Sequence, residues 1–266
     1  MNSSSIESDP KQRFSNRVED YIRYRPGYPA AILNALREEC GLRAESVVAD
    51  IGSGTGLLAQ MFLENGNLVY GVEPNAAMRE AGEQLLEKHP HFCSVAGSAE
   101  ATTLPAAGVD FVVAGQAFHW FEPAAARREF ERILRPKGWV ALIANRRISD
   151  SRPFEREYEL LLRTWGTDYA AVAATYPNRE RMVGFFGDGK FLQSSAPNQQ
   201  LFDFDGLRGR LLSSSYSPPE GHPNHAPMLV ELKRLFDAHQ SEGRVRFDYE
   251  TSMYYGQLRE DSGQKA

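Results

Sequence analysis

Three glycines at alternating positions, Gly52, Gly54 and Gly56, are the first residues whose spacing suggests chemistry. They stand in the stretch VVADIGSGTGLL, after an apolar run that ends at Asp50 and Ile51. Glycine permits a tight turn and lets a ligand approach the bare backbone. A helix N-terminus adds free N–H groups that face such a ligand. The stretch therefore predicts a strand, a loop and a helix that together hold a nucleotide-like cofactor.

The spacing of the glycines and the acidic residue before them narrow the choice of cofactor. A dinucleotide fingerprint needs a glycine where this chain has Leu57, and a P-loop needs a lysine that is missing here. The Asp50 carboxylate would repel a pyrophosphate, whereas it can accept hydrogen bonds from loop N–H groups or face a ligand ammonium. The methionine part of S-adenosylmethionine (SAM) carries such an ammonium. The residues thus favour SAM over NAD or ATP.

The same stretch resembles a known family. D-I-G-S-G-T-G resembles motif I of the class I SAM-dependent methyltransferases. The resemblance continues in register through V-E-P-N, G-S-A-E and G-Q-A-F-H-W-F, over roughly residues 45–145. It implies that Glu73 bonds both ribose hydroxyls, for which a carboxylate is suited because it accepts two donors. It also implies that G-S-A-E lies along the adenine and that Gln116 bonds SAM through its backbone carbonyl.

The cofactor-binding residues expected from this resemblance lie in the loop and at the ends of the next three strands. They are Asp50, Gly52, Ser53, Gly54, Thr55, Gly56, Glu73, Pro74, Met78, Ser98, Ala99, Glu100, Gln116 and Ala117. Met78 either packs on the adenine or makes an ordinary contact between helix and sheet. The residues themselves leave both roles open.

The flanking segments are similar to a small-molecule branch that contains trans-aconitate methyltransferase-like proteins, among the type 11 methyltransferases. These segments are RVEDYIRYRPGYP, QAFHWF and LRGRLLSSSYSP. In this interpretation Tyr24 and Arg25 cover SAM, with Arg25 pairing to its carboxylate or to an anionic acceptor, and Tyr21 lines the substrate pocket. The alternative is a solvated amphipathic helix followed by a turn. The branch does not identify the methyl acceptor.

An aromatic segment follows the fourth expected strand. His119 lies where open α/β sheets place ligands, so it is the candidate catalytic residue that deprotonates or orients the acceptor. Its alternative role is a hydrogen-bonded wall residue. Phe118, Trp120 and Phe121 are candidate substrate-pocket residues, although aromatic side chains more often form core.

Apolar strands alternate with amphipathic helices from residue 45 to 145, which favours a parallel sheet covered on both faces. We expect a Rossmann-like α/β fold with a seven-stranded, mostly parallel sheet, a C-terminal antiparallel strand and a small cap insertion. Residues 1–12 are predicted to be a disordered tail and residues 13–266 the methyltransferase domain. Residues 167–200 lack clear periodicity and are predicted to form a substrate lid.

Composition restricts the partners. The net charge of −5 argues against broad nucleic-acid binding. A basic stripe over residues 127–135 is interrupted by Glu129 and Glu131, so it favours a solvated face. No zinc-type His and Cys spacing is present, so no metal is expected. No apolar run approaches the length of a membrane helix, and no secretory signal starts the chain. A cytoplasmic protein whose two cysteines are free thiols is expected.

Three functions remain open from the sequence. The first is methylation of a small molecule at a carboxylate, hydroxyl or activated carbon, by in-line displacement. The second is methylation of RNA or protein, and the third is SAM binding without turnover. The fourth strand lacks the [DN]-P-P-[YF] and Pro-Cys sequences, which disfavours methylation of nucleobase or glutamine amino groups and of cytosine C5. Oligomeric state does not follow from the sequence.

Overall fold

The computed structural model describes residues 24–170, 179–187 and 189–258, and the chain divides into two units. Unit 1 consists of residues 1–25, 149–172 and 201–246. Unit 2 consists of residues 26–148, 173–200 and 247–266. The glycine loop and the strand ends with predicted cofactor residues belong to unit 2, whereas Tyr24 and Arg25 belong to unit 1. The predicted tail lies outside the described residues.

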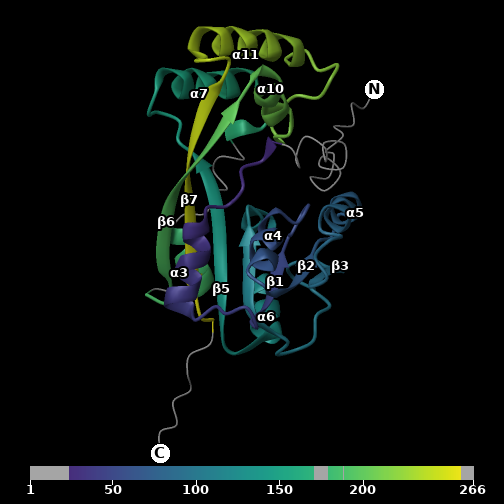
Figure 1. The fold of residues 1–266 in the computed structure, drawn as a ribbon. Helices are drawn as coiled ribbons and strands as arrows, with labels where there is room; N and C mark the ends of the chain where they lie inside the picture. The colour runs from purple at the N-terminus through teal and green to yellow at the C-terminus, as the bar shows by residue number, and fades with distance from the viewer. Residues whose placement is uncertain (1–23, 171–178, 188, 259–266) are drawn as a thin grey trace, which may run out of the picture. The chain divides into compact units, whose positions relative to one another are not determined.

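Within the described residues, seven strands form one sheet in the order β3-β2-β1-β4-β5-β7-β6 (Figure 1). The strands are β1 (Val47–Ile51), β2 (Leu68–Val72), β3 (Phe92–Val95), β4 (Val109–Gly115), β5 (Leu134–Arg147), β6 (Leu192–Phe202) and β7 (Val245–Gly256). The first five are mutually parallel, and β7 runs antiparallel to β5. The predicted mostly parallel sheet with an antiparallel C-terminal strand is thereby confirmed.

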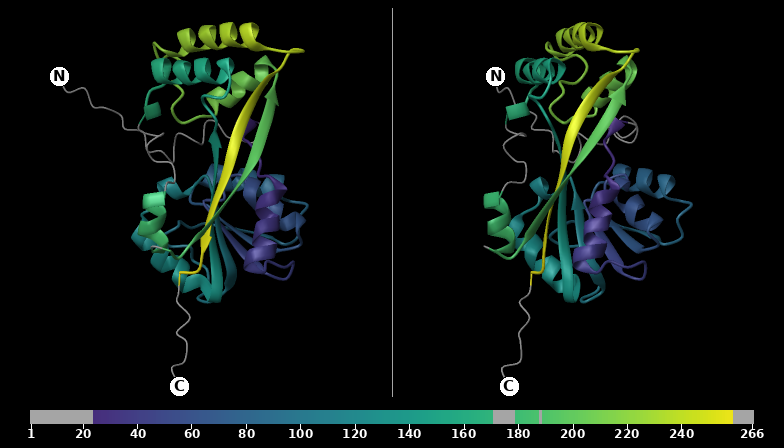
Figure 2. Two further views of the ribbon diagram at one scale, coloured as in Figure 1. Left: turned by 90° about the vertical axis from the view of Figure 1, so that its left-hand side faces the viewer. Right: turned by 60° about the vertical axis from the view of Figure 1, so that its left-hand side comes forward.

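Helices cover both faces of the sheet, as predicted. The helical segments of unit 2 are α3 (Ala30–Cys40), α4 (Leu57–Glu64), α5 (Ala76–Leu85), the 3₁₀ turn η1 (Phe118–Trp120), α6 (Pro123–Ile133) and α9 (Arg179–Phe186). Helices α3 and α4 lie on one face, and α6 and α9 lie on the other (Figures 1 and 2). The β1 and β4 strands between them are buried on both sides, which explains their continuous apolar sequences.

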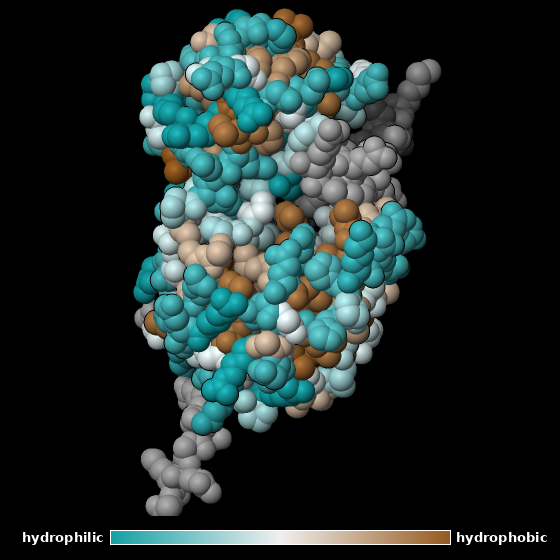
Figure 3. Space-filling model, in the orientation of Figure 1, coloured by the Kyte–Doolittle hydropathy of each residue, from teal (hydrophilic) through white to brown (hydrophobic). Residues whose placement is uncertain are grey.

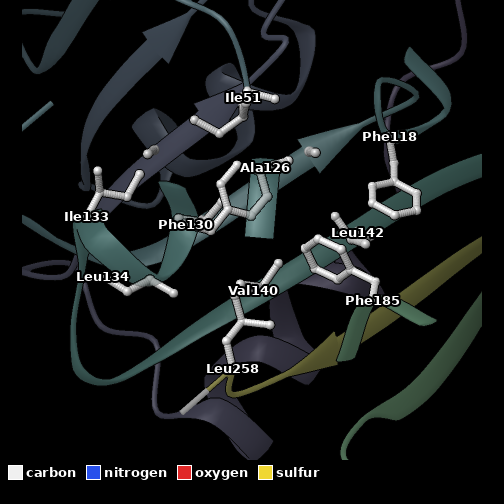
Figure 4. Close-up of a cluster of buried hydrophobic side chains, with 14 of the residues drawn as sticks. Ile51, Phe118, Ala126, Phe130, Ile133, Leu134, Val140, Leu142, Phe185 and Leu258 are labelled. Carbon is white, nitrogen blue, oxygen red and sulfur yellow. The ribbon is translucent and has the colours of Figure 1, made fainter. Parts of the chain in front are cut away.

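The core beneath α6 and α9 is closely packed. Phe130 on α6 and Phe185 on α9 are at most 1% exposed, and their ring centroids are 6.0 Å apart in an edge-to-face arrangement. Figure 4 shows these rings together with Ile51, Val140 and Leu142 from the sheet. Edge-to-face pairs add to the free energy gained from area burial. This packing anchors α9 to the sheet.

A buried carboxylate, Glu129 of α6, is held by several donors. Thr102 donates to it through its backbone N–H at 2.8 Å and its hydroxyl at 2.5 Å, and Arg132 donates at 2.7 Å. The Arg132 hydrogen bonds, and then those from Thr102, lower the pKa of Glu129 to about 2. A depressed carboxyl pKa contributes stability above the unfolded-state pKa of 4.5, and this stability is lost as pH falls from there toward 2.

We therefore expect Glu129→Gln to lower the free energy of unfolding at pH 7 by on the order of 2 kcal/mol, discounted because Arg132 is partly exposed. As pH falls from 4.5 toward 2 the difference from the wild type shrinks, because Glu129 becomes protonated in the unfolded state and then in the folded state. Urea titrations from pH 2 to 7 measure the effect. The exposed Glu87→Gln serves as a control that changes stability little. A pH-independent difference for Glu129→Gln would contradict this interpretation.

Unit 1 is helical in its described part. Its helices are α7 (Pro153–Trp165), α10 (Phe204–Leu212) and α11 (His225–His239). Glu157 of α7 joins α7 to α11, because it accepts from Arg234 and bonds His239, each at 3.0 Å. Glu155 of α7 is fully buried and accepts from Ser151 and Arg152. These bonds stabilise a helical layer that the sequence rhythm alone did not predict as a unit.

The structure differs from the sequence expectation in the predicted lid at residues 167–200. Residues 179–186 form α9, which is packed in the core through Met182, Phe185 and Phe186. Residues 192–200 belong to β6, the last strand of the sheet. β6 is polar and contains Pro197, a residue that sheets tolerate at an edge. Its weak apolar alternation explains why residues 167–200 showed no clear periodicity in sequence.

The outer surface carries no broad apolar area on the face in view. Hydrophobic residues appear there as separate patches among hydrophilic ones (Figure 3). Over residues 24–170, 179–187 and 189–258, no helix has the length and hydropathy needed to cross a bilayer.

Candidate active site

The glycine loop begins where β1 ends. Its first residues are tied to the end of β2, because the N–H groups of Gly52 and Ser53 donate to the Val72 carbonyl at 2.8 and 3.2 Å. Gly52, Gly54 and Gly56 all have positive φ, at 67°, 57° and 84°. Only glycine adopts such angles without strain. The alternating glycines therefore reflect a run of left-handed backbone that opens α4.

The three glycines differ in what surrounds them. A Cβ on Gly52 would stand 2.6 Å from the Ala117 Cβ, and one on Gly56 would stand 2.4 Å from Leu86 Cδ1. A Cβ on Gly54 would meet only the Met78 methyl, at 3.7 Å. Protein packing thus requires two of the glycines. At Gly54, by contrast, the protein's own packing leaves room beside the backbone.

Glu73 lies directly after β2 and is 8% exposed. Its Oε2 accepts from the Gly54 N–H at 2.9 Å, and its Oε1 accepts from the Asn75 N–H at 2.8 Å. Asn75 caps α5 by accepting from the Met78 N–H at 3.1 Å. The carboxylate is thereby fixed against the loop, with Met78 beside Gly54. Pro74, between Glu73 and Asn75, is exposed.

Asp50 is the most unusual group in this region. It is 1% exposed, and neither carboxylate oxygen has a hydrogen-bond partner among the described residues. Burial raises its pKa to about 7, and the nearby Glu73 charge adds to the increase, while the Ala59 amide opposes it without reaching hydrogen-bond geometry. A buried carboxylate without a partner is costly for the folded protein. Such an unmet acceptor is typical of a binding site.

The end of β3 contributes a tight turn. Ser98 and Ala101 pair as an isolated antiparallel bridge, which encloses Ala99 and Glu100. Ala99 is buried, and Glu100 accepts from the Glu122 N–H at 2.9 Å. This bond joins the turn to the start of α6. The predicted adenine-edge segment is therefore ordered by bonds of its own.

Three consecutive residues at the end of β4 each meet a different part of unit 2. Gly115 lies against Tyr28, whose hydroxyl would be 2.3 Å from a Cβ there. Gln116 has φ of 57° and donates its side-chain amide to the Asn145 carbonyl at 2.8 Å. Ala117 lies against Gly52. The loop after β1 and the end of β4 are thus brought into direct contact.

The aromatic residues after β4 take different positions. Phe118 is buried in the core beside Phe185, with ring centroids 5.1 Å apart (Figure 4). Phe121 packs edge-on against both Phe118 and Phe130. His119 is partly exposed, its ring 4.6 Å from that of Trp120, which is 46% exposed. Trp120 is therefore the exposed residue of this segment, and His119 and Phe121 are both partly buried.

The predicted cofactor residues before α3, Tyr24 and Arg25, belong to unit 1, whereas the glycine loop belongs to unit 2. Tyr24 packs on Gly209, and Arg25 donates to the Ser213 carbonyl at 2.8 Å, so both contact α10 and its end within unit 1. Tyr21 lies outside the described residues. Their predicted roles at the cofactor remain predictions.

Two residues of this region were not singled out from sequence. Tyr28 belongs to the Pro-Gly-Tyr-Pro segment, whose aromatic residue was an available signal. Asn145, 3% exposed at the end of β5, had no sequence signal because its role depends on contacts among distant segments. In the part of the chain that the structure describes, no group of three or more His, Cys, Asp or Glu is arranged to hold a metal.

Comparison with known proteins agrees with this geometry. Residues 49–142 match the family model described as a methyltransferase domain. An uncharacterised methyltransferase of Schizosaccharomyces pombe is 28% identical over 91% of this chain and 95% of its own length. One of Mycobacterium bovis is 35% identical over 52% of this chain and 54% of its own length. The trans-aconitate-like branch is not specifically supported by these matches.

A solved structure from Anaeromyxobacter dehalogenans, named as a candidate type II methyltransferase, has the same fold. The TM-score is 0.65 at 23% identity, covering 88% of this chain and 98% of that one. The matched family segment contains the glycine loop, Glu73 and the β4 end, which are the elements assembled above. Residues 49–142 thus carry a methyltransferase domain, and the domain match and the shared fold support a class I SAM-dependent methyltransferase.

Proposed function

We propose that this protein transfers a methyl group from SAM to a small-molecule acceptor bearing a carboxylate, hydroxyl or activated carbon. The proposal places the cofactor along the glycine loop, with Glu73 at the ribose and Ser98 to Glu100 at the adenine edge. Gln116 and Ala117 would lie beside its methionine part. When bound, SAM supplies a methyl group already activated on a sulfonium.

The buried Asp50 carboxylate supports this proposal most strongly. In the part of the chain that the structure describes it has no hydrogen-bond partner, and its pKa of about 7 leaves it partly ionised at neutral pH. A cationic ligand would place a positive charge near the Asp50 carboxylate and favour its ionised form. A pyrophosphate would add negative charge and make the burial of Asp50 more costly. The second carboxylate, Glu73, faces the same loop through the Gly54 N–H. Two acidic groups at a bare backbone suit a positively charged nucleoside.

The chain's own residues would then position the reactants. Methyl transfer is an in-line displacement, so orientation and electrostatics supply most of the acceleration. The proposed contacts for the acceptor are the exposed Trp120 and the partly exposed His119, whose rings are 4.6 Å apart. A carboxylate acceptor needs no base, whereas a hydroxyl acceptor needs a group such as His119 to take its proton.

Isothermal titration with SAM tests the cofactor site. Glu73→Ala is expected to weaken SAM binding by about 1–3 kcal/mol, the cost of removing a charged hydrogen-bond partner. The exposed Glu64→Ala on α4 serves as a control with unchanged affinity. Equal SAM affinity in wild type and Glu73→Ala, with both folded, would contradict the site. Binding of a dinucleotide in preference to SAM would also contradict it.

A methyl-release screen over small carboxylic acids, phenols and quinone-like compounds identifies the acceptor. His119→Ala separates the two roles of that residue. If His119 is the base, we expect kcat to fall by about 100-fold or more while SAM affinity is retained. Turnover near that of the wild type would make His119 a wall residue. Turnover only on RNA or protein would contradict the small-molecule acceptor.

A further inference from the structure

Gln116 combines a strained backbone with a side chain that is committed to a neighbouring strand. Its φ of 57° lies in the left-handed region, which a residue with a Cβ rarely adopts. Its backbone N–H donates to the Ile143 carbonyl at 2.9 Å, and its side-chain amide donates to the Asn145 carbonyl at 2.8 Å. β5 thus holds Gln116 at two points.

The acceptor for that side chain is itself fixed by a buried polar network. The Asn145 side-chain amide donates to the carbonyls of Pro26 and Gly27, at 3.3 and 3.1 Å. Its Oδ1 accepts from the hydroxyl of Thr251 on β7 and from Asn198 of β6. Asn145 and Thr251 are 3% and 0% exposed. Buried amides bonded at each polar atom hold one geometry.

We propose that Gln116 is a positioning residue, whose side-chain bond to Asn145 holds the left-handed turn that presents the β4 end to the bound reactants. This inference rests on the proposed function, because it concerns the same site. A nonglycine residue in this conformation persists only when its surroundings impose it. Asn145 supplies that constraint from β5, and the contacts of Gly115 with Tyr28 and of Ala117 with Gly52 restrict the flanking residues.

Two substitutions at one position separate positioning from direct contact. Gln116→Ala removes the side-chain bond and keeps the strain, so we expect SAM affinity to fall roughly 5- to 50-fold. Gln116→Gly also removes the bond, but glycine adopts the left-handed turn freely. We expect it to recover most of the affinity lost in Gln116→Ala. If Gln116→Gly binds SAM as weakly as Gln116→Ala, or if Gln116→Ala binds like wild type, the positioning role is wrong.

Asn145→Asp tests the network itself, because a carboxylate cannot donate to the Pro26 and Gly27 carbonyls. We expect a loss of SAM affinity in this variant that is not additive with Gln116→Ala, since both act on one turn. Additive losses would overturn the link between the two residues.

Nuclear magnetic resonance of the protein without SAM gives a readout independent of the proposed function. The Gln116 side-chain amide is expected to exchange slowly with solvent in wild type and faster in Asn145→Asp. Rapid exchange in wild type would overturn the inference. Absence of SAM binding by wild type, with the slow exchange retained, would instead contradict the proposed function alone.

Discussion

Asp50→Asn is expected to stabilise the ligand-free protein at alkaline pH and to abolish most of its affinity for SAM. The folded-state pKa of Asp50 is raised from 3.8 to about 7, so between these values the folded state binds more protons than the unfolded state. Stability therefore falls as pH rises through this window. At 1.36 kcal/mol per pKa unit the loss reaches about 4 kcal/mol at most. Asparagine is neutral and does not incur it.

Urea unfolding at pH 4 and pH 8 measures the first effect. The free energy of unfolding of the variant should exceed that of the wild type by roughly 2–4 kcal/mol at pH 8 and match it near pH 4. Titration with SAM measures the second. Affinity of wild type should rise as pH passes 7, because the ionised carboxylate is proposed to face the cofactor's cation, whereas the variant should bind about 10- to 150-fold more weakly at pH 8. A less stable variant at pH 8, or undiminished affinity, would contradict this account of Asp50.

Gly54→Ala is expected to impair SAM binding with only a modest loss of stability. A methyl group at Gly54 meets nothing closer than Met78 at 3.7 Å, but it occupies the bare backbone where the cofactor is proposed to lie. We expect affinity to fall about 10- to 100-fold. The left-handed backbone itself adds about 1 kcal/mol of destabilisation.

Gly41→Ala is the matched control. Gly41 ends α3 with φ of 71° and has nothing within 4 Å of an added Cβ. The Gly41→Ala variant should therefore lose about as much stability as Gly54→Ala while keeping its affinity for SAM. Equal affinities of the two variants would mean that strain, not contact with the cofactor, explains the loss at Gly54.

The strand, loop and helix around the glycines were predictable from sequence because local signals coincide there. A buried parallel strand, left-handed glycines and a helix start all fall within residues 47–57, so each supports the others. The position of Glu73 directly after the next strand was predictable for the same reason. Its bond to the Gly54 N–H was not predictable, because that bond depends on the register of β1 against β2.

Other features were out of reach of local patterns. The left-handed turn at Gln116 depends on Asn145, 29 positions away, and nothing in the sequence around Gln116 indicates a positive φ. β6 carries few apolar residues, because an edge strand is covered less than a central one, so apolar periodicity did not reveal its place in the sheet. Unit 1 combines segments on both sides of β6, so no continuous run of residues marked it as a unit.

The division of the chain has a consequence for how relatives diverge. Every residue of the segment that matches the methyltransferase family model, 49–142, belongs to unit 2, and the stretches of unit 1 enter only before β1 and after β5. Mutations can therefore accumulate in the helical layer without touching the cofactor loop. Similarity in that segment alone therefore does not establish that two relatives share a methyl acceptor.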